Sequence, residues 1–543
     1  MRKEILLAVL AAASLHAQVT FDRILRADKE PQNWLTYSGS TMSQRYSPLT
    51  QITPGNVNNL QLQWAFQARS LEKFEATPLV VDGMMYLTQA PNDVVALDAA
   101  TGEIKWLYSY SPSREARVCC GRVNRGLAIL GTTLYMGTID AHLVAINART
   151  GEVVWNKEVA KPEAGYSITH APLVVKDKVI VGTAGGEYGI RGSIAAFDAA
   201  TGNETWRFYT IPGKGEPGNE TWAGDSWMHG GASVWMTGSY DPELNLTYWG
   251  VGNPGADFNG DKRPGDNLYS DCVVALDADT GKLKWYFQFT PHDVWDYDSV
   301  QVPVLADMNW TGKDGRTQPR KVMLWANRNG FFYALDRTSG QFLQGKPFTK
   351  VTWATGLDEA GRPMRVNAME PTADGVKVYP SLTGGTNWYS PSYSPRTGLF
   401  YIPVWEEVFG NITKTTESFD EGKLFTGGSF RTSVPGLRGG QMRKPGDEGY
   451  GLVRAIDPHT GEKKWEFRMN DVTMSGILTT ASDLLFTGGR EGFFQALDAR
   501  TGKLLWKANA GGEIAMGPMT YQVNGKQYVA FAAGSSLFVY GPK

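Results

Sequence analysis

One pattern of apolar and polar positions recurs along the chain. A short apolar stretch leads into Asp or Asn and then Thr-Gly, and a second stretch ends in Trp. Copies occupy residues 94–106, 143–155, 194–206, 273–285, 453–465 and 494–506, and a copy without the Trp occupies residues 332–343. Gly accepts the positive φ of a tight turn, and Asp accepts hydrogen bonds from the turn's amides. The pattern predicts a β-hairpin at each copy, with Trp filling the space between neighbouring sheets.

The spacing of these hairpins predicts the architecture. Trp106, Trp155 and Trp206 are 49 and 51 residues apart, and Trp465 and Trp506 are 41 apart. Each interval suits one four-stranded blade of a β-propeller. Residues 393–403 have the character of a degraded hairpin, and counting it gives eight blades, with seven as the alternative. We therefore expect an all-β, eight-bladed propeller that forms one domain over residues 18–543.

Composition and charge limit the kinds of partner that we expect. The 62 Gly, 18 Trp and 23 Tyr suit many short strands and tight turns. With 53 basic and 55 acidic residues, the formal charge is -2, so we expect neither nucleic acid nor an anionic membrane as partner. Three cysteines are too few for a disulfide scaffold, and no Cys-x-x-Cys-His sequence occurs, so no c-type haem is expected on this chain.

The N-terminus has the features of a secretory signal. Arg2 and Lys3 precede an apolar run over residues 5–14, which is shorter than the roughly 20 residues that span a bilayer. Ala17 supplies a small residue before a cleavage point. Residues 1–17 are therefore predicted to be a signal peptide of an exported, periplasmic protein without a membrane span, and an N-terminal helix or anchor is the alternative.

Several motifs together point to one family. They are VCCGRVNRG from Val118, GGEYGIRG around Glu187, GGASVW ending at Trp235, GVGNPG around Asn253, TPHDVWDYDSV around Asp296, ANRNGFFYALDR around Arg328 and GGTNWY around Asn387. With the repeat, they resemble the quinoprotein alcohol dehydrogenases, the large-subunit family of methanol and ethanol dehydrogenases. The resemblance runs from Asn33 to the C-terminal repeats. It implies pyrroloquinoline quinone (PQQ) beside one metal ion.

The resemblance assigns residues to the quinone. A disulfide between Cys119 and Cys120 would form one face of the quinone site and Trp235 the other; two reduced thiols are the alternative for the cysteines. Arg125 matches an arginine that contacts a cofactor carboxylate, and Arg328 matches a cation that faces the quinone oxygens and stabilises negative charge. Polar contacts are expected from Glu75, Thr138, Ser233 and Asn387.

A second group of residues is assigned to the metal. Glu187 and Asn253 match metal ligands, and oxygen ligands from separate loops suit a hard cation. Asp296 matches the general base, close to the metal. Asp298 adds a carboxylate that is typical of the lanthanide-dependent branch, so a lanthanide is favoured over calcium; a solvated loop aspartate is the alternative. Met474 departs from the family, where many relatives have Trp, and Cys272 has no assigned role.

The resemblance implies oxidation of a small primary alcohol to an aldehyde, with Asp296 taking the hydroxyl proton and the metal acting as a Lewis acid. Electrons would pass to a separate periplasmic cytochrome c. The preferred alcohol and a homodimeric state are left open. The main alternative is a non-catalytic propeller that scaffolds outer-membrane assembly. A membrane-anchored sugar dehydrogenase would need membrane helices before the propeller.

Overall fold

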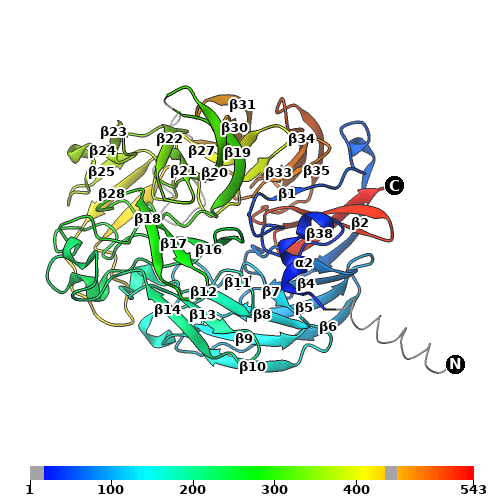
Figure 1. Ribbon diagram of the computed structural model, residues 1–543, viewed down its shortest axis with the longest axis horizontal. Coiled ribbons are helices and arrows are strands. Elements are labelled where there is room, and N and C mark those ends of the chain that lie inside the picture. Colours follow the sequence, from blue (N-terminus) through cyan, green and yellow to red (C-terminus); the bar gives the residue numbers. More distant parts are fainter. Residues whose placement is uncertain (1–17, 313, 435–448) are drawn as a thin grey trace.

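Small twisted sheets follow one another around a central axis in the computed structural model (Figure 1). The structure describes residues 18–312, 314–434 and 449–543, and the predicted signal peptide lies outside them. Within these ranges, α-helix is confined to α2 (Phe21–Leu25), and the rest is strand, turn and short 3-10 helix. No helix of the described part has the length and apolar character needed to cross a bilayer. The predicted all-β propeller fold is confirmed.

The first half of the ring consists of four antiparallel four-stranded sheets in chain order. Their strands are β3 (Leu79–Val81), β4 (Met84–Gln89), β5 (Asp93–Asp98) and β6 (Ile104–Tyr108); β7 (Ala128–Leu130), β8 (Thr133–Gly137), β9 (His142–Asn147) and β10 (Val153–Glu158); β11 (Leu173–Val175), β12 (Lys178–Gly182), β13 (Ser193–Asp198) and β14 (Glu204–Tyr209); β15 (Ser239–Asp241), β16 (Leu246–Gly250), β17 (Cys272–Asp277) and β18 (Leu283–Gln288).

The second half adds three sheets and a closing sheet. Their strands are β19 (Val304–Thr311), β20 (Thr317–Ala326), β21 (Phe331–Asp336) and β22 (Phe342–Pro347); β26 (Ser392–Ser394), β27 (Leu399–Glu406), β30 (Tyr450–Ile456) and β31 (Lys463–Arg468); β32 (Leu478–Thr480), β33 (Leu484–Gly488), β34 (Phe493–Asp498) and β35 (Leu504–Asn509), with β1 (Tyr46–Ser47) as a fifth, parallel strand; and β36 (Met519–Val523), β37 (Lys526–Ala533), β38 (Ser536–Pro542) and β2 (Leu60–Gln67).

Strand β2, near the start of the chain, pairs with the C-terminal β38 and closes the ring, from Leu60 beside Pro542 to Gln67 beside Ser536. Two small sheets lie outside this series: β23 (Ala354–Leu357) with β24 (Pro363–Arg365), and β25 (Val376–Val378) with β28 (Gly410–Lys414) and β29 (Gly428–Thr432). The degraded hairpin expected at residues 393–403 is the antiparallel pair β26 and β27.

The repeat forms the hairpins and the contacts between sheets that the sequence predicts. In the copy over residues 194–206, Asp198 Oδ1 accepts from the amide and the hydroxyl of Thr201 at 2.8 and 2.7 Å, and Gly202 has a φ of +70°. Trp206 Nε1 donates to the Ala278 carbonyl of the next sheet at 3.2 Å. A Cβ on Gly281 would lie 2.4 Å from the Trp206 ring, so only Gly permits this packing. The apolar core lies between such neighbouring sheets.

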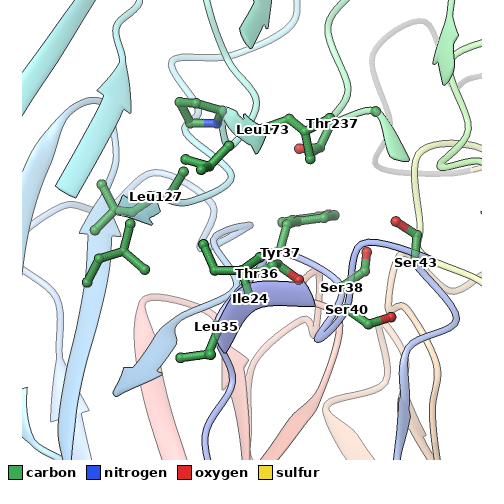
Figure 2. A pocket seen from close by; sticks show the side chains of 15 residues that line it. Ile24, Leu35, Thr36, Tyr37, Ser38, Ser40, Ser43, Leu127, Leu173 and Thr237 are labelled. Carbon is green, nitrogen blue, oxygen red and sulfur yellow. The ribbon is translucent and has the colours of Figure 1, made fainter. Parts of the chain in front are cut away.

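A small pocket lies where the N-terminal segment crosses the first strands of two sheets. Figure 2 shows Leu35, Tyr37 and Ser40 of that segment, with Leu127, directly before β7, and Leu173 of β11. Tyr37 is the sole titratable side chain among the described residues that line this pocket. The pocket contains none of the predicted site residues.

Candidate active site

The predicted metal-site residues and Arg328 lie in loops that connect strands, either within one sheet or from one sheet to the next. Glu187 is on the 3-10 helix η4 (Gly186–Tyr188), between β12 and β13, and Asn253 follows β16. Asp296 and Asp298 lie between β18 and β19, and Arg328 lies in the turn between β20 and β21. The propeller therefore gathers polar side chains that are far apart in the sequence.

Asp298 links its own loop to the loops of Asn253, Trp235 and Arg328. Its Oδ1 accepts from the Asn253 amide at 2.8 Å, and its Oδ2 accepts from Trp235 Nε1 at 3.1 Å and from Arg328 Nη1 at 2.5 Å. The residue is only 5% exposed. The alternative of a solvated loop aspartate is therefore wrong.

Asp296 and Arg328 lie next to Asp298, and the three side chains form the centre of the carboxylate cluster. Arg328 Nη1 lies 3.3 Å from Asp296 Oδ1, and both side chains are buried. Burial raises the pKa of Asp296 well above its usual range; Arg328 opposes this shift and Asp298 adds to it. Burial disfavours the charged guanidinium, but the two aspartates outweigh it and leave the pKa of Arg328 raised. The pair thus places a proton acceptor beside a permanent cation.

Small residues let the metal-ligand candidates approach one another. A Cβ on Gly252 would lie 2.3 Å from Asp298 Oδ1 and 2.9 Å from Ser233 Oγ. A Cβ on Gly186 would lie 3.1 Å from Ser233 Oγ and 3.5 Å from Asn253 Oδ1. Ser233 therefore lies between the turn of Glu187 and the loop of Asn253.

Asp257 also lies in this cluster, although no sequence pattern predicts it there. Asn253 Nδ2 donates to Asp257 Oδ1 at 3.0 Å. Burial raises the pKa of Asp257, and the charges of Glu187 and Asp298 raise it further. Its only signal in the sequence is its position four residues after Asn253, just beyond the GVGNPG motif.

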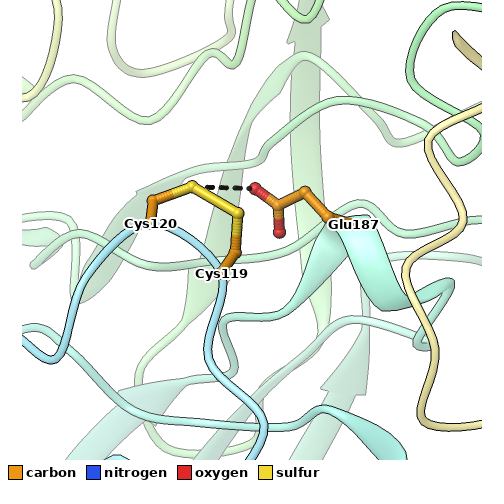
Figure 3. Close-up of side chains that lie close together, drawn as sticks. All are labelled: Cys119, Cys120 and Glu187. Atoms are coloured by element: carbon orange, nitrogen blue, oxygen red, sulfur yellow. Dashed lines mark hydrogen bonds between the residues drawn. A yellow bond between two sulfur atoms is a disulfide. The ribbon is translucent and has the colours of Figure 1, made fainter. Parts of the chain in front are cut away.

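Cys119 and Cys120 form a disulfide, so the alternative of two reduced thiols is wrong. Figure 3 shows this disulfide beside Glu187, with Cys120 Sγ 3.7 Å from Glu187 Oε1. The three residues could form a metal-binding group by distance alone. However, the thiolate is the sulfur species that binds metals, and these sulfurs are oxidised. The disulfide is therefore a neutral surface next to the carboxylate cluster.

Arg125 lies between an acid and two aromatic rings. Its guanidinium is 2.9 Å from Glu75, and it stands 5.1 and 4.7 Å from the ring centres of Trp235 and Trp388. Arg125 Nη1 also donates to Thr169 at 3.1 Å. Burial raises the pKa of Glu75, against the effect of Arg125. The structure therefore brings Glu75, Arg125 and Trp235 together.

The remaining predicted residues differ in their positions. Asn387 Oδ1 accepts from the amide of Trp388 at 2.8 Å, next to Arg125. Thr138 Oγ1 donates to Asp140 at 2.5 Å, and none of its hydrogen bonds in the described part reaches another predicted site residue. Its role as a quinone contact stays a prediction.

The two residues without an assigned role have structural surroundings. Met474 packs in a buried cluster with Trp388 and Tyr389, and its sulfur lies 3.2 Å from Lys73 Nζ. Cys272 is buried in the core between two sheets, and burial raises the pKa of its thiol well above the ordinary value. Cys272 is thus a packing residue.

A segment without a sequence motif lies next to the cluster. The amide of Phe425 donates to the Glu187 carbonyl at 2.6 Å, and the amide of Phe258 donates to the Thr426 carbonyl at 2.9 Å. The ring of Phe419 stacks on His229 with centres 3.5 Å apart. This covering segment, residues 415–428, contacts both the turn of Glu187 and the loop of Asp257.

Comparison with known protein families identifies the family of this chain. The family described as "PQQ: Glucose/ethanol/alcohol dehydrogenase, beta-propeller domain" matches residues 34–352 and 467–529. The chain belongs to the PQQ-dependent alcohol dehydrogenases. These quinoproteins are alcohol oxidoreductases, so the chain is an enzyme, and the alternative of a non-catalytic scaffold is not favoured.

Relatives of this quinoprotein alcohol dehydrogenase match it over nearly its whole length. Quinoprotein alcohol dehydrogenase PedH of Pseudomonas putida is 41% identical over 98% of this chain and 91% of its own. A solved europium-containing methanol dehydrogenase is 34% identical, with a TM-score of 0.88 over 96% of this chain and all of its own. Quinohemoprotein alcohol dehydrogenase from Comamonas testosteroni is also 34% identical, with a TM-score of 0.89 over 98% and 84%.

The residues present fit the groups that the family uses. Arg125 Nε and Arg328 Nε are buried and have no hydrogen-bond partner within the described ranges, so both donors are available to an anionic, carboxylate-bearing quinone. Carboxylate and amide oxygens of Glu187, Asn253 and Asp298 are ligands that hard cations prefer. The quinoprotein thus has suitable donors for both the quinone and a metal ion.

Proposed function

We propose that this enzyme oxidises primary alcohols to aldehydes in the periplasm and passes the electrons to a separate cytochrome c. The observation that carries the proposal is the buried arrangement of Asp296, Asp298 and Arg328 in a chain 41% identical to a quinoprotein alcohol dehydrogenase. The signal-like residues 1–17 support export, and the lack of a Cys-x-x-Cys-His sequence supports an external electron carrier.

We assign the proton transfer to Asp296. Its carboxylate would take the hydroxyl proton of the bound alcohol, and a pKa raised by burial suits a general base. Arg328, 3.3 Å from that carboxylate, would stabilise negative charge that develops beside it. When bound, the quinone supplies the two-electron acceptor for the hydride of the alcohol carbon.

We assign the quinone contacts to the residues around this pair. The Cys119–Cys120 disulfide and the Trp235 ring would border the quinone plane, since both lie against the same carboxylate cluster. Arg125 would bind a carboxylate of the quinone. Polar contacts are proposed for Glu75, Thr138, Ser233 and Asn387.

We assign the metal to Glu187, Asn253, Asp296 and Asp298, and we favour a lanthanide over calcium. Asp296 and Asp298 give the site two neighbouring buried carboxylates, and a trivalent ion offsets such charge better than a divalent one. The europium-containing methanol dehydrogenase among the structural relatives supports the same choice. A bound cation would supply a Lewis acid.

We further infer that residues 18–543 form one domain of eight blades. The support is the number of ring sheets in the described part: seven of four strands and one of five. The pairing of β2 with β38 supports a ring closed within one chain.

The assay that tests this proposal compares two metals. The purified protein is reconstituted with PQQ and either calcium or a light lanthanide, and turnover of a primary alcohol is followed with a dye acceptor. Turnover with the lanthanide alone is expected. Turnover with calcium alone would contradict the choice of metal, and a protein that bound no quinone under either condition would contradict the proposed function.

A further inference from the structure

The carboxylate of Asp257 lies behind the candidate ligand Asn253. Asp257 is only 2% exposed, and its Oδ1 accepts from Asn253 Nδ2 at 3.0 Å. Within the described residues, this is the one hydrogen bond that the Asp257 side chain makes. Because the amide nitrogen of Asn253 faces Asp257, its Oδ1 faces the opposite way, towards Gly186 and the turn of Glu187. Asp257 therefore fixes which end of the Asn253 amide is offered to a ligand.

The surroundings of Asp257 are strongly acidic. The charges of Glu187 and Asp298 act on Asp257, and the charge of Asp257 acts in turn on Asp296. Arg328 forms ion pairs with Asp296 and Asp298. Asp257 itself forms no ion pair with Lys or Arg among the residues that the structure describes.

Arg263, the cation that acts on Asp257, is already hydrogen-bonded to other groups. Arg263 opposes the shift in the pKa of Asp257, but its guanidinium donates to Asn267 Oδ1 and to the carbonyls of Ala256 and Asp293. Burying carboxylates without a compensating charge is costly, and Arg328 pairs with only two of the four, so a further cation among them would be favourable.

The backbone around Asp257 is fixed on two sides. Arg263 Nη2 donates to the Ala256 carbonyl at 2.8 Å, and the amide of Phe258 donates to the Thr426 carbonyl at 2.9 Å. These contacts hold the backbone on both sides of Asp257 in place, with its carboxylate beside Asn253. Its burial next to Asn253 is a built feature of the loop.

We propose that Asp257 is a positioning residue of the metal site and a determinant of its preference for a trivalent ion. This proposal rests on the metal assignment made above. Asp257 orients Asn253 Oδ1 towards the cation and adds a fourth carboxylate to Glu187, Asp296 and Asp298. Residues that orient metal ligands from behind typically change metal affinity about 10- to 100-fold when mutated. The added charge attracts a trivalent ion more strongly than a divalent one, because Coulomb energy scales with the ion's charge.

Two variants separate orientation from charge. Asp257→Asn keeps an oxygen that can accept from Asn253 but removes the charge, and Asp257→Ala removes both. Metal-free protein carrying PQQ is titrated with Tb³⁺, followed by luminescence excited through tryptophan, and with Ca²⁺ by competition. Asp257→Asn is expected to weaken Tb³⁺ binding about 10-fold and Ca²⁺ binding less. Asp257→Ala is expected to weaken both ions further.

Asp261→Asn is the matched control. Asp261 lies in the same loop, is exposed and pairs with Lys414 at 2.9 Å, so the variant removes the same charge at the surface. It is expected to bind both ions as the wild type does. Circular dichroism and thermal melting verify that each variant is folded.

The outcomes distinguish a failure of the role of Asp257 from a failure of the metal site itself. Wild-type affinities in both Asp257→Asn and Asp257→Ala would overturn the role of Asp257 and leave the metal site intact. An equal loss for Tb³⁺ and Ca²⁺ in Asp257→Asn would overturn the charge preference. A wild-type protein that bound neither ion would overturn the metal site itself, and the inference with it.

Discussion

Aspartates serve two regions of this enzyme in different ways. At the turn of one repeat hairpin, here called the corner, Asp198 accepts hydrogen bonds from Thr201, three residues along, and these bonds lower the pKa of a partly exposed carboxyl. In the central cluster, Asp298 accepts from groups 30, 45 and 63 residues away, and burial raises the pKa of its neighbour Asp296. The hydrogen bonds of the corner aspartate come from its own turn, whereas the cluster holds more carboxylates than its one paired cation, Arg328, can neutralise.

This difference explains what each region does. Local hydrogen bonds make the corner a repeatable unit, which the chain reuses around the ring. The cluster depends on loops from several sheets, and its excess of carboxylates suits a cation rather than stability. Changes at the cluster should therefore affect chemistry, and changes at the corners should affect folding.

The largest effect is expected from Asp296→Asn. Because this change removes the proposed general base but keeps the size of the side chain, turnover should fall about 10²- to 10⁴-fold. Steady-state kinetics at saturating metal, with the absorbance of bound quinone as a control for loading, measure the effect. Normal turnover in fully loaded Asp296→Asn would exclude Asp296 as the base.

The second-largest effect is expected from a change at a corner of the repeat. Trp206→Ala removes a ring that packs on Gly281 and donates to Ala278, and it should lower the free energy of unfolding by about 3–5 kcal/mol. Urea unfolding measures the loss, and turnover per folded molecule should equal that of the wild type. A large fall in turnover with unchanged stability would contradict the separation of the two regions.

A comparable effect is expected on acidification, at His170. This buried imidazole is neutral: Nε2 accepts from the Gly182 amide at 2.9 Å and Nδ1 donates to Ala171. Burial lowers its pKa to about 4, from 6.5. The unfolded state therefore binds the proton first, and stability should fall by about 3 kcal/mol as the pH drops from 6.5 to 4.

The control for His170 is a variant that cannot titrate. His170→Gln keeps polar groups at this position, and unfolding measured across the same pH range should have a shallower slope than in the wild type. Identical slopes in the two proteins would rule out His170 as a source of the acid sensitivity.

The smallest effect is expected from Asp198→Ala. The loss of the two hydrogen bonds from Thr201 should cost about 1 kcal/mol, since the turn is exposed and water replaces the acceptor. Thermal melting detects this change. A loss as large as that of Trp206→Ala would show that the corner depends on more than its local bonds.

The sequence predicts the corner better than the cluster, for a physical reason. The hairpin, its Asp and its Gly interact within a few residues, so the repeat alone indicates them. The same contact at Trp64, whose ring packs on Gly102, was not predicted because Trp64 lies outside any copy of the pattern. The site residues were found only through their resemblance to a family.

The features that the sequence did not predict depend on contacts between residues that are far apart along the chain. Phe425 meets Glu187 across 238 positions (425 − 187), and no local pattern encodes that meeting. Asp257 is a single aspartate in a loop, and only the fold shows that it is buried beside Asn253. The order of the sheets follows from the repeat, but the contents of the loops between them do not.

The most direct test of the central claim is a crystal structure of the enzyme soaked with PQQ and europium, with anomalous scattering measured at the europium edge. We expect one strong anomalous peak, bounded by oxygens of Glu187, Asn253, Asp296 and Asp298. A peak elsewhere, or none among these residues, would contradict the assignment of the cluster as the metal site.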